Sequence, residues 1–278
     1  METDYETIVI GGGVVGSGIA YHLSERYKEG VLVLDKKYPM SGTSGSTQAW
    51  VWVHNKTPSW YAEFNMYSAE LYPYLSKKIG DVEYKRTGGL SPFFHESDRE
   101  KAQKLAESYR KIGIKIKVLS REEVLEKEPY MNPEVAGATY SSIDGNVNPF
   151  RLIDMYMRAA KRNGVRYSAY NKVTEIKKHN GKYLVVSDKG AFECKNLILA
   201  GGTWSREIGE MLGIKIPVNQ LRGQILVSEP LKPFLNFTIS GLRQANNGEV
   251  LMGYSMEEAG FNRATTLDVI QETANMAV

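Results

Sequence analysis

The strongest constraint in this sequence is a glycine-rich segment between two short apolar runs near the start of the chain. Residues 7–10 read Thr-Ile-Val-Ile, a helix-like stretch occupies 17–27, and a second strand-like run, 31–34, ends at Asp35. Three glycines between the first run and the helix satisfy the pattern GxGxxG: Gly11, Gly13 and Gly16. Strand, glycines, helix, strand and acid at this spacing predict a βαβ unit that binds a dinucleotide.

Each part of this pattern has a physical reason. A tight turn from strand to helix favours glycine at Gly11, and the missing Cβ of Gly13 lets the backbone approach a pyrophosphate. Gly16 and Ala20 allow the helix to pack closely, and Asp35 stands where a carboxylate accepts hydrogen bonds from ribose hydroxyls. An acidic residue at position 35 argues against a dinucleotide that carries a 2′-phosphate. The motif alone does not separate NAD from FAD, and a bare glycine-rich turn is the structural alternative.

The chain after this unit does not continue as a plain series of βα repeats. Residues 41–49 form a loop rich in hydroxyl groups and glycine, which suits phosphate or ribityl oxygens, with a flexible surface linker as the alternative. Short strand-like segments alternate with turns over 165–187, including a hairpin signal at Asn180-Gly181. An apolar strand at 196–200 leads into a second glycine-rich strand end. This order predicts an antiparallel meander and speaks against an NAD-dependent dehydrogenase.

The composition excludes several other classes of protein. Lys and Arg number 35 and Asp and Glu 32, so the net charge is +3, without the basic tail or block of a nucleic-acid-binding protein. Cys194 is the one cysteine, which excludes an intrachain disulfide, a redox CxxC pair and a cysteine-based zinc site. No metal site is expected. No apolar run approaches the ~20 residues of a transmembrane helix, and the early first strand leaves no room for a secretory signal, so we expect a cytoplasmic protein.

Helix signals mark the scaffold. Thr57 and Pro58 begin one helix, and Pro73 is expected to kink or end that helix. One face of this helix is apolar: Trp60, Phe64, Tyr67, Leu71 and Tyr74. A second helix is expected to start at Pro149 and to stop at Gly164.

These segments together resemble the FAD-dependent D-amino acid oxidase superfamily, in the branch with glycine oxidase, sarcosine oxidase and amino-acid or opine dehydrogenase subunits. The resemblance covers nearly the whole chain, and the order of its motifs is more specific than any one of them. Besides the opening fingerprint, the motifs are 42–46, 144–149 before a helix, 197–205, 217–224, and 248–253 followed by 257–261.

The resemblance implies an α/β fold, in which a Rossmann-like FAD-binding domain with a β-meander is interleaved with an α+β substrate domain. It assigns 1–79 and 148–213 to the FAD-binding domain, and 80–147 and 214–278 to the substrate domain. Members of the family continue beyond the equivalent of Val278, so the substrate domain is expected to be incomplete at its C-terminus. The chain is then a fragment, or a partner completes the site, or the protein is a shortened, inactive form.

The same resemblance implies that FAD lies extended across the sheet. The implied FAD-binding residues are Gly11, Gly13, Gly16, Asp35, Lys36, Thr43, Ser44, Ser46, Gln48, Ala49, Trp50, Val173, Ala200, Gly201 and Trp204. The glycines of the fingerprint would face the pyrophosphate, and Asp35 and Lys36 the adenosine ribose. The loop hydroxyls would bond the phosphates and the ribityl chain, 48–50 would approach the isoalloxazine, and Val173 would contact adenine through its backbone. Ala200, Gly201 and Trp204 would line the far side of the FAD. For Trp50 and Trp204 the alternative is burial in the core.

The substrate side rests on fewer residues. The candidates are His54, Arg222, Gln224, Arg243, Gln244 and Tyr254. A solvated loop histidine is the alternative for His54, and a surface or structural ion pair is the alternative for Arg243. No residue is assigned as a catalytic acid or base.

The implied activity is oxidation of the C–N bond of a small amino acid or secondary amine. The reaction would transfer a hydride to flavin N5 and give an imine that hydrolyses. The expected partners are this substrate and a partner subunit or a second copy of the chain. The alternative is a flavin-binding or assembly subunit, or an inactive fragment, whose catalysis needs another chain or a further C-terminal segment. The sequence leaves open the substrate, its stereochemistry, the electron acceptor, the oligomeric state and any covalent attachment of FAD.

Overall fold

The computed structural model describes residues 4–27, 29–253 and 255–277, and the contacts among them divide the chain into two compact units. Unit 1 comprises the described residues up to 47 together with 79–82 and 149–220. Unit 2 comprises 48–78, 83–148 and the described residues from 221 onward. The segment 48–78, which was expected in the first domain, therefore groups with unit 2.

Unit 1 is built on a six-stranded sheet in the order β8-β2-β1-β11-β10-β9. Its strands are β1 (Asp4–Ile10), β2 (Val31–Leu34), β8 (Arg166–Ser168), β9 (Val173–His179), β10 (Lys182–Ser187) and β11 (Gly190–Leu199). The first four strands in the sheet order run parallel, and β10 is antiparallel to both of its neighbours. The helical elements are α1 (Val14–Arg26), η1 (Thr43–Gly45), α5 (Pro149–Arg162), η3 (Gly202–Trp204) and α6 (Ser205–Glu210).

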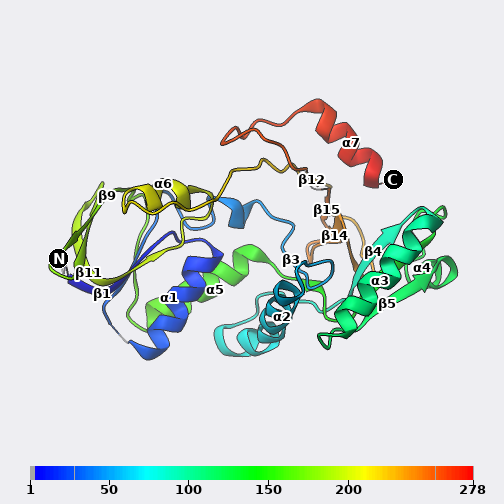
Figure 1. Ribbon diagram of the computed structural model, residues 1–278, viewed down its shortest axis with the longest axis horizontal. Helices are drawn as coiled ribbons and strands as arrows, with labels where there is room; N and C mark the ends of the chain where they lie inside the picture. The colour runs from blue at the N-terminus through cyan, green and yellow to red at the C-terminus, as the bar shows by residue number, and fades with distance from the viewer. Residues whose placement is uncertain (1–3, 28, 254, 278) are drawn as a thin grey trace. The chain divides into compact units, whose positions relative to one another are not determined.

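The parallel strands of unit 1 are covered on both faces. Ile8 and Leu34 belong to the hydrophobic core that also contains Ile208 of α6. Val9 and Val33 point to the opposite face, because side chains alternate along a strand, and they are equally buried. Figure 1 shows α1 and α5 side by side in this unit, and α1 packs on β1 and β2. Coverage of both faces explains why these strands read as continuous apolar runs.

The meander of unit 1 follows the predicted hairpin signal. Asn180 and Gly181 join β9 to β10 with φ angles of 49° and 76°, the left-handed pair that a tight hairpin turn of type I′ requires. The hairpin prediction is confirmed. β11 begins at Gly190 rather than at Asn196, because its first residues pair with β10 before the strand pairs with β1.

Unit 2 contains a seven-stranded sheet in the order β12-β15-β14-β13-β4-β6-β5 and a separate pair, β3-β7. Its strands are β3 (Trp50–Val51), β4 (Gly89–Phe93), β5 (Ile116–Ser120), β6 (Gly137–Ser141), β7 (Gly145–Asn146), β12 (Leu226–Val227), β13 (Thr238–Ile239), β14 (Leu242–Gln244) and β15 (Val250–Met252). Its helical elements are α2 (Ser59–Ile79), η2 (Glu96–Asp98), α3 (Arg99–Arg110), α4 (Arg121–Lys127) and α7 (Leu267–Ala277). The pairing of β3 with β7 is what joins the segment after residue 47 to this unit.

The helix predictions have different outcomes. α5 begins at Pro149, and Gly164 follows its end with a φ of 94°, as predicted. α2 continues through Pro73 to Ile79, so the proline does not end this helix. The apolar face of α2 that runs from Trp60 to Tyr74 is exposed, with its five side chains between 51% and 67% accessible.

Candidate functional site

The fingerprint glycines lie where β1 ends and α1 begins, and two of them leave no room for a side chain. Gly11 has a φ of 112°, and a Cβ added to it would stand 2.2 Å from the carbonyl oxygen of Ala200. A Cβ on Gly16 would stand 1.9 Å from the carbonyl oxygen of Gly11. Ala200 follows β11, which is the neighbour of β1 in the sheet. Two glycine-rich strand ends therefore meet in unit 1, and we call this arrangement of Gly11, Gly16 and Ala200 the glycine cradle.

The first turn of α1 presents backbone N–H groups beside the glycine cradle. Its N-cap residue, Gly13, makes no side-chain cap bond, and none of the described residues of the first turn is acidic. The Val14 N–H donates to the Ser44 hydroxyl over 3.0 Å. A helix N-terminus with a glycine backbone and a hydroxyl beside it has the donor chemistry that binds phosphate.

Asp35 lies at the end of β2, beside the same turn. Its Oδ2 accepts the Gly12 N–H over 2.7 Å, and its Oδ1 accepts the Lys37 N–H over 2.9 Å. These bonds fix the carboxylate at the strand end, and each oxygen keeps a second lone pair that a ribose hydroxyl can use. The carboxylate thus fits the role of a ribose acceptor.

The hydroxyl-rich loop of unit 1 is folded into the single turn η1. The Gly45 N–H donates to the Gly42 carbonyl over 3.2 Å, and the Ser46 N–H donates to the Thr43 carbonyl over 3.1 Å. A Cβ on Gly45 would stand 2.2 Å from the Met40 carbonyl oxygen, so this turn is tight. Thr43 and Ser46 flank Ser44, which already lies at the N-terminus of α1.

Lys36 and Trp204 pack against each other in unit 1. The Lys36 ammonium lies 3.3 Å from the centroid of the Trp204 ring. Burial lowers the pKa of this amine. Trp204 also packs on the hydrophobic core of the unit, so the ring is half-buried between the core and the lysine.

The remaining unit 1 candidates offer backbone rather than side chains. Val173 begins β9 and has its side chain in the core, which leaves only its backbone for a ligand. A Cβ on Gly201 would stand 2.4 Å from the Ile208 side chain, so glycine here lets α6 lie close to the end of β11.

Three of the implied FAD contacts belong to unit 2 instead. Gln48 is buried, and its Nε2 donates to the Gly253 carbonyl over 2.5 Å. Ala49 has a φ of 53°, and its carbonyl accepts the Val147 N–H over 3.1 Å. Trp50 lies in β3, which pairs with β7.

His54 is fully buried, so the alternative of a solvated loop histidine is wrong. Its Nδ1 lies 3.5 Å from Oδ2 of Asp144, which is also fully buried. The other oxygen of Asp144 accepts the Val53 N–H over 2.8 Å.

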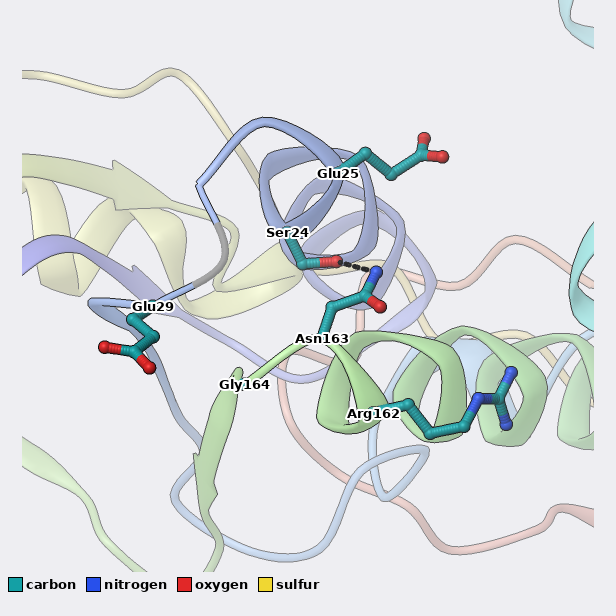
Figure 2. Close-up of a pocket in the computed structure, with 6 residues that line it drawn as sticks. All are labelled: Ser24, Glu25, Glu29, Arg162, Asn163 and Gly164. Atoms are coloured by element: carbon teal, nitrogen blue, oxygen red, sulfur yellow. Dashed lines mark hydrogen bonds between the residues drawn. The ribbon is translucent and has the colours of Figure 1, made fainter.

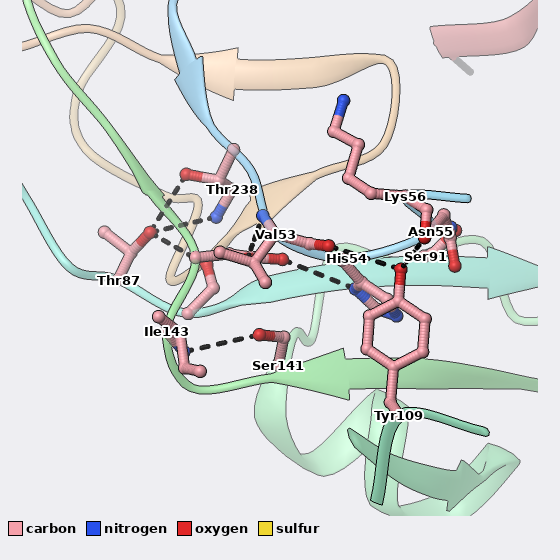
Figure 3. Close-up of polar contacts among 12 residues, drawn as sticks. Val53, His54, Asn55, Lys56, Thr87, Ser91, Tyr109, Ser141, Ile143 and Thr238 are labelled. Carbon is pink, nitrogen blue, oxygen red and sulfur yellow. Dashed lines mark hydrogen bonds and ion pairs between the residues drawn. The ribbon is translucent and has the colours of Figure 1, made fainter. Parts of the chain in front are cut away.

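A tyrosine holds the next residues of the same segment. The Tyr109 hydroxyl donates to the Lys56 carbonyl over 2.7 Å, and burial raises the pKa of Tyr109 to about 12. This cluster holds the chain after β3 in place (Figure 3), and sequence reasoning missed the pairing of His54 with Asp144.

Arg222 and Gln224 are both engaged by Glu257. Arg222 Nη2 lies 2.5 Å from one carboxylate oxygen of Glu257, and Gln224 Nε2 donates to the other over 2.9 Å. The bonds from Arg222, Ser255 and Gln224 lower the pKa of Glu257 to about 2. Both candidates therefore fasten the segment around Glu257 to the chain before β12.

Arg243 is buried, and no acidic side chain among the described residues forms an ion pair with it. Its Nη1 donates to Asn146 Oδ1 over 3.4 Å and to the Val147 carbonyl over 3.2 Å, and burial lowers the pKa of the guanidinium. The surface position considered for this residue is wrong, because only 5% of it is exposed. The amide of Gln244 is satisfied by neighbouring backbone groups. Tyr254 lies outside the described residues.

Figure 2 shows a pocket of unit 1. Its lining comes from the C-terminal ends of α1 and α5: Ser24, Glu25, Glu29, Arg162, Asn163 and Gly164. The cradle lies at the opposite, N-terminal end of α1. Among the residues that the structure describes, no group of three or more His, Cys, Asp and Glu side chains is arranged to hold a metal ion. In the same residues, no helix has the length and apolar character needed to span a bilayer.

Comparison with known proteins identifies relatives across the whole chain. The family described as "DAO: FAD dependent oxidoreductase" matches residues 6–278. The chain is 30% identical over 322 residues to the hydrogen cyanide synthase subunit HcnC of Pseudomonas protegens, which covers 99% of this chain and 77% of that protein. It is 28% identical over 287 residues to one of the subunits of opine oxidase from Agrobacterium tumefaciens, with coverage of 99% and 77%. It is 24% identical over 289 residues to the glycine oxidase of Bacillus subtilis, with coverage of 100% and 76%.

Solved structures show the same fold. Glycine oxidase from Geobacillus kaustophilus matches with a TM-score of 0.93 at 22% identity, over 99% of this chain and 77% of that chain. L-proline dehydrogenase from P. horikoshii matches with a TM-score of 0.91 at 24% identity, over 99% and 76%. The glycine cradle, the fold and the family match agree: the chain belongs to the DAO family of FAD-dependent oxidoreductases.

Proposed function

We propose that this chain oxidises the C–N bond of a small amino acid or secondary amine, with unit 1 as the FAD-binding part and unit 2 as the substrate-binding part. The observation that carries the proposal is the glycine cradle, where the ends of β1 and β11 meet beside the N-terminus of α1. The amine class is supported by similarity to a protein named glycine oxidase and to one named as part of opine oxidase.

The residues of unit 1 fit FAD by their own chemistry. Gly13 and the first turn of α1 would lie against the pyrophosphate, because free N–H groups and the helix dipole favour a phosphate there. Asp35 would accept from the adenosine ribose through its remaining lone pairs. Ser44, with its neighbouring hydroxyls in η1, would bond the phosphates and the ribityl chain.

When bound, FAD supplies a hydride acceptor at N5 for the carbon next to the amine nitrogen. The part of the protein is to hold that carbon in position, to keep the amine in its neutral form and to exclude water. The imine product hydrolyses in water after release. We assign no side chain as a general acid or base.

A second candidate function is that of a flavin-carrying subunit whose catalysis needs another chain. Two relatives favour it by name, since HcnC is named as a subunit of hydrogen cyanide synthase and the Agrobacterium relative as a subunit of opine oxidase. Copurification with a second polypeptide that is required for turnover is the expected result for this candidate.

The test is flavin uptake followed by reduction. We expect the purified protein to carry flavin absorbance that bleaches without oxygen when glycine, sarcosine, proline or a D-amino acid is added. A protein that takes up no FAD contradicts both candidates. Flavin that no amine bleaches until a second chain is added contradicts the first candidate and supports the second.

A further inference from the structure

The dipeptide Asn-Gly occurs at three places in this chain. The pairs are Asn163-Gly164, Asn180-Gly181 and Asn247-Gly248. In such a pair the glycine nitrogen can attack the side-chain amide carbon of the asparagine, because glycine has no Cβ to hinder the approach. The attack needs a glycine N–H that is not hydrogen-bonded and an amide that can turn toward it. The fold around each pair therefore decides whether this reaction can occur there.

The first pair is held by hydrogen bonds at the end of α5. The Gly164 N–H donates to the Lys161 carbonyl over 3.0 Å. The Asn163 amide nitrogen donates to the hydroxyl of Ser24, a buried residue, over 3.1 Å. Both reacting groups are thus engaged, and the attack would first have to break two hydrogen bonds.

The third pair is held in the turn between β14 and β15. The Gly248 N–H donates to the Ala245 carbonyl over 3.0 Å. The Asn247 side-chain oxygen accepts the Glu249 N–H over 3.2 Å. A Cβ added to Gly248 would stand 2.5 Å from the Leu231 carbonyl oxygen, so the backbone is enclosed here. This pair is protected by its contacts as well.

The second pair lies in an open turn of unit 1. Asn180 and Gly181 form the two-residue link between β9 and β10, outside the ladder that pairs His179 with Lys182. Both residues of the turn are exposed, and a Cβ added to Gly181 would meet no atom within 4 Å. Among the hydrogen bonds of the described residues, none is donated by the Gly181 N–H. The attacking nitrogen is therefore available at this pair.

A histidine lies beside the atom that would leave. The Nε2 atom of His179 is 3.0 Å from Nδ2 of Asn180, and His179 is exposed. Imidazole takes up and releases protons near neutral pH. The amide nitrogen must gain a proton as its bond to carbon breaks, because it leaves as ammonia. The imidazole is within hydrogen-bond distance of that nitrogen and can supply the proton.

We propose that Asn180-Gly181 is a site of spontaneous deamidation, in which His179 assists the departure of the amide nitrogen. The Gly181 nitrogen forms a bond to Cγ of Asn180 and gives up its proton to water. The bond from Cγ to Nδ2 then breaks, and Nδ2 leaves as ammonia with a proton from His179, which regains one from water. The product of this step is a cyclic imide. Water opens the imide at either carbonyl and leaves aspartate or isoaspartate at position 180, and no oxidant or reductant is needed.

The isoaspartate form changes the turn itself. Its main chain runs through the side-chain carbon atoms, so the link between β9 and β10 gains a CH₂ group. A two-residue turn sets the register of the strands that it joins. We expect the pairing next to the turn to loosen, seen as faster hydrogen exchange of these amides than of those near Val173. Exchange that is the same in the modified and unmodified protein contradicts this consequence.

The selectivity is tested by incubation of the purified chain in mildly alkaline buffer. Peptide mass mapping measures the conversion of each asparagine, and ion exchange separates the product, which carries an additional negative charge. We expect Asn180 to convert about 10-fold faster than Asn163 and Asn247 in the folded protein, because only those two pairs are hydrogen-bonded. The difference should shrink in urea, where these bonds are lost. Equal conversion in the folded protein, or a difference that urea leaves unchanged, overturns the proposal.

The attack by the glycine nitrogen is tested with Gly181→Asn. Asparagine tolerates the left-handed backbone of this turn, and the space around Gly181 accepts its Cβ. The new Cβ stands beside the attacking nitrogen, so we expect the conversion of Asn180 to slow about 10-fold. Thermal unfolding verifies that the variant is folded. An unchanged rate at Asn180 overturns the site.

The part played by the histidine is tested with His179→Gln. Glutamine keeps a polar side chain but has no group that titrates near neutral pH, so we expect release of ammonia from Asn180 to slow about 3-fold. A rate equal to that of the wild type contradicts the assistance by His179. None of these measurements needs FAD or an amine substrate, so their outcome is independent of the proposed amine oxidation.

Discussion

The two units hold their candidate residues in different ways. In unit 1 the site is shaped by backbone, because Gly11 and Gly16 stand so close to neighbouring carbonyls that no side chain fits. In unit 2 the candidates are side chains whose partners lie far along the chain, as in the contact of Gln48 with Gly253. A local turn can be predicted from the spacing of residues in the sequence, whereas a site whose residues come from distant parts of the chain cannot.

The largest expected effect tests the backbone-shaped site of unit 1. Gly16→Ala places a Cβ 1.9 Å from the Gly11 carbonyl oxygen, so the helix and the strand end must move apart. We expect a loss of about 3 kcal/mol or more in the free energy of unfolding, together with loss of FAD. Chemical denaturation and flavin absorbance of the purified protein measure the two effects.

Gly18 supplies the matched control in the same helix. A Cβ on Gly18 would meet the Tyr156 ring at 3.7 Å, an ordinary contact. Gly18→Ala should therefore stabilise the protein by about 0.5–1 kcal/mol through helix propensity and keep FAD. Similar behaviour of the two variants would show that the cradle does not depend on close packing.

The next effect tests the long-range side-chain pairs of unit 2. Asp144→Asn replaces the carboxyl group that lies 3.5 Å from His54, in a site where both side chains are fully buried. We expect a loss of about 2–4 kcal/mol in the free energy of unfolding, because the amide has one acceptor oxygen for the Val53 N–H and leaves the buried imidazole without the second oxygen beside it. Urea unfolding of the variant and of the wild type gives the difference.

A second histidine–carboxylate pair offers the control. His22 and Glu25 lie 3.2 Å apart on α1, but their side chains are 52% and 29% exposed. Glu25→Gln should cost less than about 0.5 kcal/mol, because water screens the pair. A loss for Asp144→Asn as small as this one would mean that burial does not govern the strength of these pairs.

The same difference between local and long-range contacts explains which features could be predicted from the sequence. The spacing of Gly11, Gly16 and Asp35 predicted the turn, and Asn180-Gly181 predicted a hairpin, because each signal depends on neighbours in the chain. The burial of His54 could not be predicted, because its partner Asp144 arrives from the link between β6 and β7.

Arg222 and Arg243 make the same point. The sequence offers both arginines as candidates for the substrate side. In the structure Arg222 forms an ion pair with Glu257, whereas Arg243 donates hydrogen bonds to neutral oxygens. Only the register of the strands around them separates the two, and no local pattern records that register.

Glu128, at the end of α4, provides a smaller effect that depends on pH. Burial raises the pKa of this carboxyl group above its usual 4.5, although the backbone N–H groups of Asn236 and Phe237 oppose the shift. A raised pKa in the folded state means that protonation stabilises the fold below pH 4.5 and that this contribution is lost as the pH rises through the shifted value. In Glu128→Gln this dependence should disappear. Urea unfolding at a series of pH values checks it, and an unchanged dependence contradicts the assignment.

Glu257 should show the opposite sign and the smallest effect, because its side chain keeps 21% of its surface exposed and water partly screens the ion pair with Arg222. Its folded-state pKa of about 2 is below its usual 4.5. Its contribution to stability is therefore complete above pH 4.5 and is lost as the pH falls toward 2. Glu257→Gln should remove this part of the acid sensitivity, seen as a shallower fall of unfolding free energy over that range. Arg222→Met should do the same, and an acid sensitivity that neither variant alters argues against the ion pair between Arg222 and Glu257.

The exposed face of α2 carries a tryptophan whose fluorescence can report on this surface. Of the four tryptophans, Trp60 is 66% accessible, whereas Trp50, Trp52 and Trp204 are half-buried. A water-soluble quencher such as iodide will act mainly on Trp60, and any molecule that covers the helix will shield its emission. Fluorescence can therefore follow events on this surface, while the visible absorbance of the flavin follows the FAD site that we propose for unit 1.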